Sequence, residues 1–207
     1  TDADWHASEC TGVAWNPVAE VFSAVWIRTD QMSSQRYLQT RTIDPAGNLG
    51  PVQQVNQIIP GETPQEPGIA CASSSGRCLV AWLETEPVMW ERGIRTRLLD
   101  DTGIPIGNEA VVVEGDAYLF NPRVIYNPDL DEFLVVYWTE WPTGVIDVTA
   151  QRVRASDGLL LSSAVVATGT DFERKDARAA HLQGHDRYLI AYTCEDAAEN
   201  EKVCATI

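Results

Sequence analysis

A repeat of about 55 residues dominates the sequence. One segment rich in apolar and aromatic residues occurs four times, and successive copies start 57, 55 and 55 residues apart. The copies are Glu20–Trp26 (EVFSAVW), Arg77–Leu83 (RCLVAWL), Glu132–Trp138 (EFLVVYW) and Arg187–Thr193 (RYLIAYT). A fixed period of this length is typical of architectures in which each unit buries its apolar face against the next unit.

Each of the first three repeats holds four short elements with the composition of β-strands, and the last repeat holds three. In the third repeat these elements are Val124–Pro128, Glu132–Trp138, a segment around Arg152 and Ala164–Ala167. They are rich in Val, Ile, Tyr, Trp and Thr, and turn residues such as Asn-Pro and Ser-Asp-Gly bound them. The second element is almost wholly apolar, which indicates a strand covered on both faces.

The period and the four strands predict an all-β fold, a β-propeller of four roughly 55-residue, four-stranded blades in a single domain, 1–207. The predicted blades span 11–57, 67–113, 122–167 and 177–207, and the last blade lacks its outer strand. A β-sandwich is the alternative, but it does not predict near-identical units. The tryptophans in strands, which are Trp15, Trp26, Trp82 and Trp138, are expected in the core.

The third repeat also carries a resemblance. The run VIYNPDLDEFLVVYW, continued by TAQRV and SDG, resembles the repeats of secreted bacterial β-propeller proteins. Four units of this size are also similar in architecture to hemopexin-like four-bladed propellers. The resemblance implies the fold and an extracellular setting, and it supplies no catalytic residues and no haem ligands.

Five cysteines bear on the cellular compartment. Cys71 and Cys78 flank a short turn, and Cys194 and Cys204 flank a longer one, so two hairpin disulfides fit, with free buried thiols as the alternative. Disulfides would indicate an oxidising compartment. Cys10 is then left free or paired elsewhere. The chain begins Thr-Asp-Ala-Asp, as expected of a mature form after signal removal or of a piece of a longer protein.

Charge excludes some partners. The chain has 15 Lys and Arg against 30 Asp and Glu, a formal net charge of -15, so nucleic acid is not an expected partner. No apolar run reaches the roughly 18 residues of a membrane span, so membrane insertion is not expected. Much of the acidity serves solubility.

Aromatic residues beside carboxylates gather in the loops that connect blades and in those that connect second and third strands. An aromatic ring stacks on a sugar while a neighbouring carboxylate accepts hydroxyl hydrogens, and the same pairing suits a cationic amine. Packing of these rings between blades is the alternative. The candidate ligand-binding residues are Asp4, Trp5, Trp90, Glu91, Asp116, Tyr118, Glu140, Trp141, Asp171 and Phe172.

Metal and enzyme signals are weak. No cofactor is expected other than calcium, for which the acidic sequences Asp2-Ala3-Asp4 and Glu195-Asp196 are the nearest candidates. The motifs of serine hydrolases, zinc proteases and phosphate-binding loops are absent. Arg41, Arg97 and Arg152 recur at one repeat position and are expected to be structural, for instance in ion pairs with turn acids such as Glu20 or Glu132.

The sequence therefore predicts a secreted, non-catalytic module that binds glycans through one propeller face. Two alternatives stay open. The first is a protein-interaction or assembly module, including a homodimer through the incomplete last blade. The second is a glycoside hydrolase with two carboxylates drawn from different blades.

Overall fold

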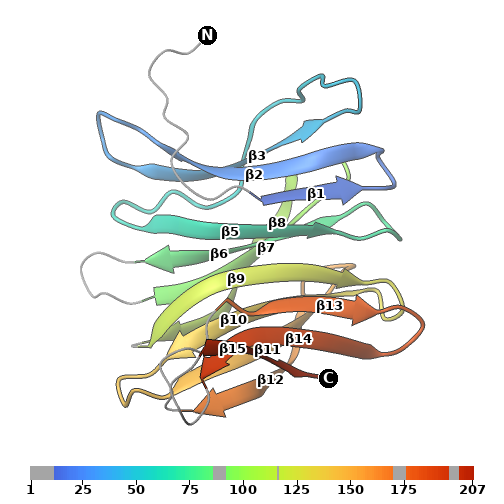
Figure 1. Cartoon of the computed structure of the whole chain (residues 1–207). Coiled ribbons are helices and arrows are strands. Elements are labelled where there is room, and N and C mark those ends of the chain that lie inside the picture. The colour runs from blue at the N-terminus through green and yellow to red at the C-terminus, as the bar shows by residue number, and fades with distance from the viewer. Residues whose placement is uncertain (1–11, 86–91, 116, 170–175, 196–200) are drawn as a thin grey trace.

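The computed structural model describes residues 12–85, 92–115, 117–169, 176–195 and 201–207. These residues form fifteen strands and no helix, arranged in four antiparallel sheets (Figure 1). Sheet 1 contains β1 (Gly12–Asn16), β2 (Val21–Thr29), β3 (Arg36–Ile43) and β4 (Gln53–Gln54). Sheet 2 contains β5 (Thr63–Cys71), β6 (Cys78–Thr85), β7 (Arg92–Leu99) and β8 (Pro105–Gly115).

The second half of the chain repeats this plan with one difference. Sheet 3 contains β9 (Tyr118–Asn127), β10 (Glu132–Glu140), β11 (Ile146–Arg154) and β12 (Leu160–Gly169). Sheet 4 contains β13 (Arg178–Leu182), β14 (Arg187–Glu195) and β15 (Glu201–Thr206). Strands pair in chain order within every sheet, and sheet 4 has three strands within the described residues.

Neighbouring sheets lie face to face; in Figure 1, sheet 1 is at the top, sheet 2 lies below it, and sheets 3 and 4 overlap in the lower part of the view. The first strand of each sheet contacts the first strand of the next: β1 contacts β5, β5 contacts β9, and β9 contacts β13. Three apolar layers fill the spaces between sheets, each with side chains from both neighbours. Trp82 is fully buried between sheets 1 and 2, and Phe133 between sheets 2 and 3.

The repeated Asn-Pro turn shows how the sequence produces this stacking. Asn16 and Asn127 are both fully buried, and each side-chain oxygen accepts hydrogen bonds from two backbone N–H groups of its own turn. Each side-chain amide then donates to the following sheet. Asn16 donates to the Gly76 carbonyl at 2.6 Å, and Asn127 donates to the Tyr188 hydroxyl at 3.0 Å. The residue therefore shapes its turn and ties it to the neighbouring sheet.

The all-β prediction is confirmed, and sheet 4 contains three strands within the described residues. A closed ring is not shown, because among the described residues β13 does not pack on β1 as the other first strands pack on each other. The expectation of a buried Trp15 is wrong. Trp15 is 42% exposed because it lies on the face of sheet 1 that points away from sheet 2.

Two disulfides are present, and both join neighbouring strands. Cys71 on β5 pairs with Cys78 on β6, and Cys194 on β14 pairs with Cys204 on β15. Each bond closes a short hairpin, which stabilises a fold mainly by restricting the unfolded chain. They indicate an oxidising, extracellular environment. Cys10 lies outside the described residues. Within those residues no helix is long and apolar enough to cross a membrane.

The three recurrent arginines have structural roles that differ in detail. Arg152 donates two hydrogen bonds of 2.7 Å to the Glu132 carboxylate, which confirms the expected ion pair. Arg41 instead donates to the Gly50 carbonyl within its own sheet. Arg97 bridges two sheets, because it donates to the carbonyl of Val55 and to that of Gly107.

Candidate functional site

Most of the predicted ligand-binding residues lie outside the described part of the chain. These are Asp4, Trp5, Trp90, Glu91, Asp116, Asp171 and Phe172, and they remain predictions. The Asp2–Asp4 sequence proposed for calcium lies outside it too, as does Asp196. Within the described residues there is no cluster of three or more His, Cys, Asp or Glu side chains that could hold a metal. Tyr118, Glu140 and Trp141 are described.

Tyr118, Glu140 and Trp141 come together at one end of sheet 3. Tyr118 begins β9 and lies directly opposite Glu140, the last residue of β10, in the strand register. Residues opposite each other in an antiparallel pair project from the same face, so the phenol and the carboxylate are neighbours. Trp141 follows Glu140 in the turn to β11. The three residues therefore lie at the same end of sheet 3.

The two rings are exposed and held in defined positions. Tyr118 is 51% exposed and Trp141 is 44% exposed, so neither is packed between sheets. The Trp141 indole Nε1 donates a 2.8 Å hydrogen bond to the Asp147 carboxylate, which fixes the direction of the ring. Rigid, exposed rings are suited to stacking against a ligand, because little side-chain freedom is lost on binding.

An aromatic stack supports Tyr118 from beneath. Phe120 stacks on Trp138 with ring centroids 3.9 Å apart, and Tyr118 stacks on Phe120 at 6.5 Å. The Arg92 guanidinium, from sheet 2, lies 4.7 Å from the centroid of Tyr118 and 5.1 Å from that of Phe120. Cation–π contacts of this kind anchor the rings and place a positive charge beside the exposed phenol. Arg92 was not foreseen from the sequence.

A second feature that sequence reasoning missed lies along the first strands. Glu66, Asn121 and Asp176 are spaced by 55 residues, and their φ angles are 50°, 50° and 51°. Positive φ in a residue other than glycine carries backbone strain of about 1–3 kcal/mol. The Asn121 N–H donates to Glu66 at 2.6 Å, and its side-chain amide contacts Asp176 at 3.4 Å. These residues therefore link sheets 2, 3 and 4. Their 55-residue spacing was the available signal.

A buried carboxyl group lies between sheets 1 and 2. Glu84 is only 3% exposed, and one of its oxygens accepts a 2.7 Å hydrogen bond from the Trp82 indole. Burial raises the pKa of Glu84 to about 7, and the nearby negative charge of Glu62 raises it further while the Trp82 bond opposes the rise. Glu62 is also buried, with an oxygen 3.9 Å from the Arg95 guanidinium. The burial of both carboxyls favours a role in stability over one in catalysis.

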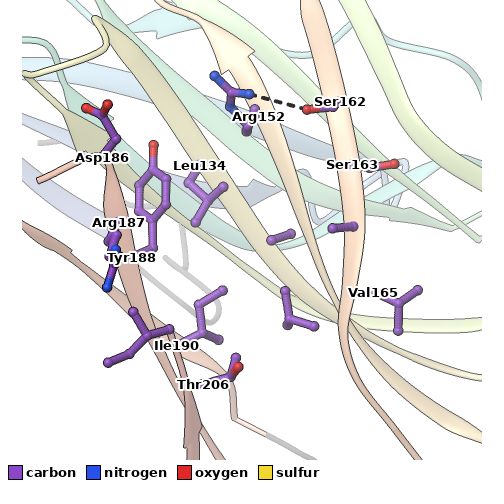
Figure 2. Close-up of a pocket in the computed structure, with 14 residues that line it drawn as sticks. Leu134, Arg152, Ser162, Ser163, Val165, Asp186, Arg187, Tyr188, Ile190 and Thr206 are labelled. Atoms are coloured by element: carbon purple, nitrogen blue, oxygen red, sulfur yellow. Dashed lines mark hydrogen bonds between the residues drawn. The ribbon is translucent and has the colours of Figure 1, made fainter.

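A large cleft lies between sheets 3 and 4 (Figure 2). It measures about 850 Å³ and is lined by β10, β11 and β12 on one side and by β14 and β15 on the other. In Figure 2, Asp186, Arg187 and Tyr188 lie on one side, and Ser162, Ser163 and Val165 lie along the opposite strand. This cleft is separate from the Tyr118, Glu140 and Trp141 group and was not predicted as a site.

Comparison with known proteins shows similarity in fold to solved structures, and it does not assign the chain to a family. No protein-family model matches the sequence, and no curated protein matches it. Among solved structures, Hadza microbial sialidase Hz136 is similar over 98% of this chain, with a TM-score of 0.68 and 9% identity. An N-acetylgalactosamine deacetylase from F. plautii, solved with blood group B trisaccharide, is similar over 99%, with a TM-score of 0.56 and 11% identity.

A putative exo-β-1,3-galactanase from Bifidobacterium bifidum is similar over 93% of this chain, with a TM-score of 0.53 and 10% identity. The described chain spans 44% of the sialidase, 72% of the deacetylase and 65% of the galactanase. At 9–11% identity the likeness concerns the β-propeller-like fold. The names of these structural neighbours all denote proteins that act on glycans.

Proposed function

We propose that this protein is a secreted, non-catalytic glycan-binding module and that Tyr118, Glu140 and Trp141 form its sugar-contacting surface. The observation that carries the proposal is the placement of an exposed tyrosine directly opposite a carboxylate that an exposed tryptophan follows. Stacking rings with an adjacent hydrogen-bond acceptor suit the apolar face and the hydroxyl rim of a sugar. The glycan-acting structural neighbours support a carbohydrate ligand.

The architecture in this proposal is a propeller-like arc of four blades. Successive contacts between the first strands of neighbouring sheets support the blade arrangement. The arc places the Tyr118 end of sheet 3 beside the start of β7 in sheet 2, which supplies Arg92. A guanidinium beside the sugar-contacting ring would favour glycans that carry a hydroxyl-rich or anionic group at that point.

The test is a glycan array probed with the intact chain and two variants, Tyr118→Ala and Trp141→Ala. Loss of either stacking ring is expected to lower affinity for a bound glycan about tenfold or more, since 1.4 kcal/mol corresponds to a factor of ten. Trp15→Ala is the matched control, because Trp15 is 42% exposed, close to the 44% of Trp141, and lies in sheet 1. This control should bind as the unmodified chain does.

Two outcomes would contradict the proposal. Unchanged binding by both Tyr118→Ala and Trp141→Ala would remove this surface from recognition. Release of a sugar product from any bound glycan, followed by chromatography, would replace the non-catalytic module with the hydrolase alternative. In that case the carboxylates near the surface, beginning with Glu140, would become candidates for the acid and base.

A further inference from the structure

Only one of the two oxygens of the buried Glu84 carboxyl has a hydrogen-bond partner within the described residues. Oε2 accepts the 2.7 Å bond from the Trp82 indole, and Oε1 is buried without a partner. A protonated carboxyl is much less costly to bury in this way than a carboxylate. Ionisation of Glu84 would place a charged oxygen without a hydrogen-bond donor between sheets 1 and 2.

The charged groups of sheet 2 around Glu84 do not offset a negative charge at this position. Glu62 lies just before β5 and Glu109 lies on β8, and both carboxylates favour the neutral form of Glu84. Arg95 on β7 opposes them, but its guanidinium also lies 3.9 Å from Glu62, and its Nε is buried without a hydrogen-bond partner in the described part of the chain. Glu114, two strands from Glu84 in the same row of the register, is exposed.

The strands of sheet 1 that pack on this region present mainly apolar side chains. Ile27 on β2 and Leu38 on β3 are fully buried in the layer shared with sheet 2. Arg36 begins β3, two residues before Leu38, and projects from the same face of the strand. Burial of Glu84 outweighs the nearby positive charges, because its pKa rises to about 7 despite them.

Glu84 lies at the end of the strand pair that carries Arg92. In the register of β6 and β7, Glu84 lies opposite Gly93, and the next residue, Thr85, lies opposite Arg92. The Arg92 guanidinium lies 4.7 Å from the centroid of the Tyr118 ring. One residue pair of the β6–β7 ladder and one cation–π contact therefore connect the buried carboxyl to the sugar-contacting ring.

We propose that Glu84 makes the glycan site sensitive to pH: its ionisation loosens this end of the β6–β7 pair, draws Arg92 away from Tyr118 and weakens glycan binding. The carboxylate becomes hydrated only when the end of the pair separates from sheet 1, so the loosened arrangement binds fewer protons than the packed one. The effect on glycan affinity rests on the proposed function, whereas the response of the two strands to pH does not.

The size of the effect follows from the proton affinity of Glu84 in the two arrangements. Its pKa is about 7 when the residue is buried and has the ordinary value of 4.5 when it is hydrated. Protonation therefore favours the packed arrangement at pH 6, and almost all of this preference is lost at pH 8. Between these two pH values the equilibrium constant for loosening rises about tenfold.

Hydrogen–deuterium exchange of the 207-residue chain at pH 6 and pH 8 measures this loosening, once the rates are corrected for the pH dependence of intrinsic amide exchange. Protection of β6 and β7 is expected to fall about tenfold at pH 8, whereas β10 is the internal reference and should keep its protection. Glu84→Gln retains the shape of the side chain but cannot ionise, so its protection should be the same at both pH values. Glu114→Gln removes the exposed carboxyl and should behave as the unmodified chain does.

A second measurement connects the strands to the site. The glycan that gives the strongest signal on the array is titrated into the chain at pH 6 and pH 8 by calorimetry. Its affinity is expected to fall at least twofold, and at most about tenfold, at pH 8, because the loosened molecules do not bind. In Glu84→Gln the affinity should be the same at both pH values.

Three results would overturn the proposal. Equal corrected protection of β6 and β7 at both pH values in the unmodified chain would show that no proton controls this strand pair. A fall of the same size in Glu84→Gln would assign the response to another group. Unchanged affinity for the bound glycan would separate the strand response from the glycan site. An array with no bound glycan at either pH would instead refute the proposed function, and the exchange rates would still decide whether Glu84 controls the strands.

Discussion

Phe22 and Phe133 occupy equivalent positions in the strand register of sheets 1 and 3, each opposite the residue that precedes the buried Asn of the turn, yet their surroundings are opposite. Each lies on the second strand of its sheet, a few residues after an Asn-Pro turn, and each faces an aromatic partner on the first strand, Trp15 or Tyr126. Phe22 is 42% exposed and Phe133 is 0% exposed. The difference comes from the neighbouring sheet. Sheet 2 covers Phe133, and no described sheet covers Phe22.

The same contrast holds along whole strands. Every residue of β10 except Glu140 is buried, because sheets 2 and 4 cover its two faces. In β2 the buried residues alternate with partly or fully exposed ones, because sheet 2 covers one face only. The local sequence thus determines where a strand forms, and the number of sheets that pack against it determines how far its residues are buried. The sheet faces that pack against a neighbouring sheet form the apolar layers that stabilise the fold, and the faces without such a neighbour are accessible to solvent and to ligands.

The largest expected effect tests this contrast directly. Phe133→Ala should lower the free energy of unfolding by about 3–5 kcal/mol, because it leaves a cavity between two sheets. Phe22→Ala should cost less than about 1 kcal/mol, because half of its ring already contacts solvent. Urea denaturation of the two variants measures both values. Similar losses would show that the free face of sheet 1 is covered in solution.

Much of the fold could be predicted from the sequence, because the strands and turns repeat with their chemistry intact. The Asn-Pro turns, the two disulfides and the Arg152–Glu132 pair each depend on residues close in sequence or on a repeated position. Which face of each sheet is covered by a neighbouring sheet could not be predicted in this way. Trp15 is an aromatic residue in an apolar strand, which predicts burial. It is exposed because no described sheet packs on its face of sheet 1, and the residues around Trp15 in the sequence do not reveal this.

The residues of the candidate site show the same difference between what nearby sequence reveals and what depends on contacts between sheets. Tyr118, Glu140 and Trp141 were foreseen because aromatic residues near carboxylates are recognisable in the sequence of the long loops. Arg92 was missed because it reaches Tyr118 from another sheet. The positive-φ position shared by Glu66 and Asn121 was missed because both precede proline, a context that ordinarily favours extended backbone.

A smaller effect concerns the covered interface between sheets 1 and 2. The pKa of Glu84 is about 7 in the folded chain against an ordinary value of 4.5, so the folded chain binds more protons than the unfolded chain between these values. The resulting stabilisation is fully present below about pH 4.5 and is lost as the pH rises through 7. It amounts to about 3 kcal/mol, at 1.36 kcal/mol for each unit of pKa difference.

Glu84→Gln removes this dependence. Urea denaturation between pH 4.5 and 8 should show the unmodified chain losing stability with rising pH relative to Glu84→Gln. Glu114→Gln, at an exposed position on β8 in the same sheet, is the control and should follow the unmodified chain. Parallel curves for all three proteins would show that Glu84 is not buried at an interface between sheets.

The most direct test of the contrast between covered and uncovered sheets is hydrogen–deuterium exchange of the 207-residue chain, read by mass spectrometry. β2, β6, β10 and β14 are each central in their sheet, so in-sheet pairing is matched and only coverage differs. Amides of β6 and β10 are predicted to exchange at least tenfold more slowly than those of β2 and β14. Equal protection of all four strands would contradict this account, because it would place a covering surface on sheets 1 and 4.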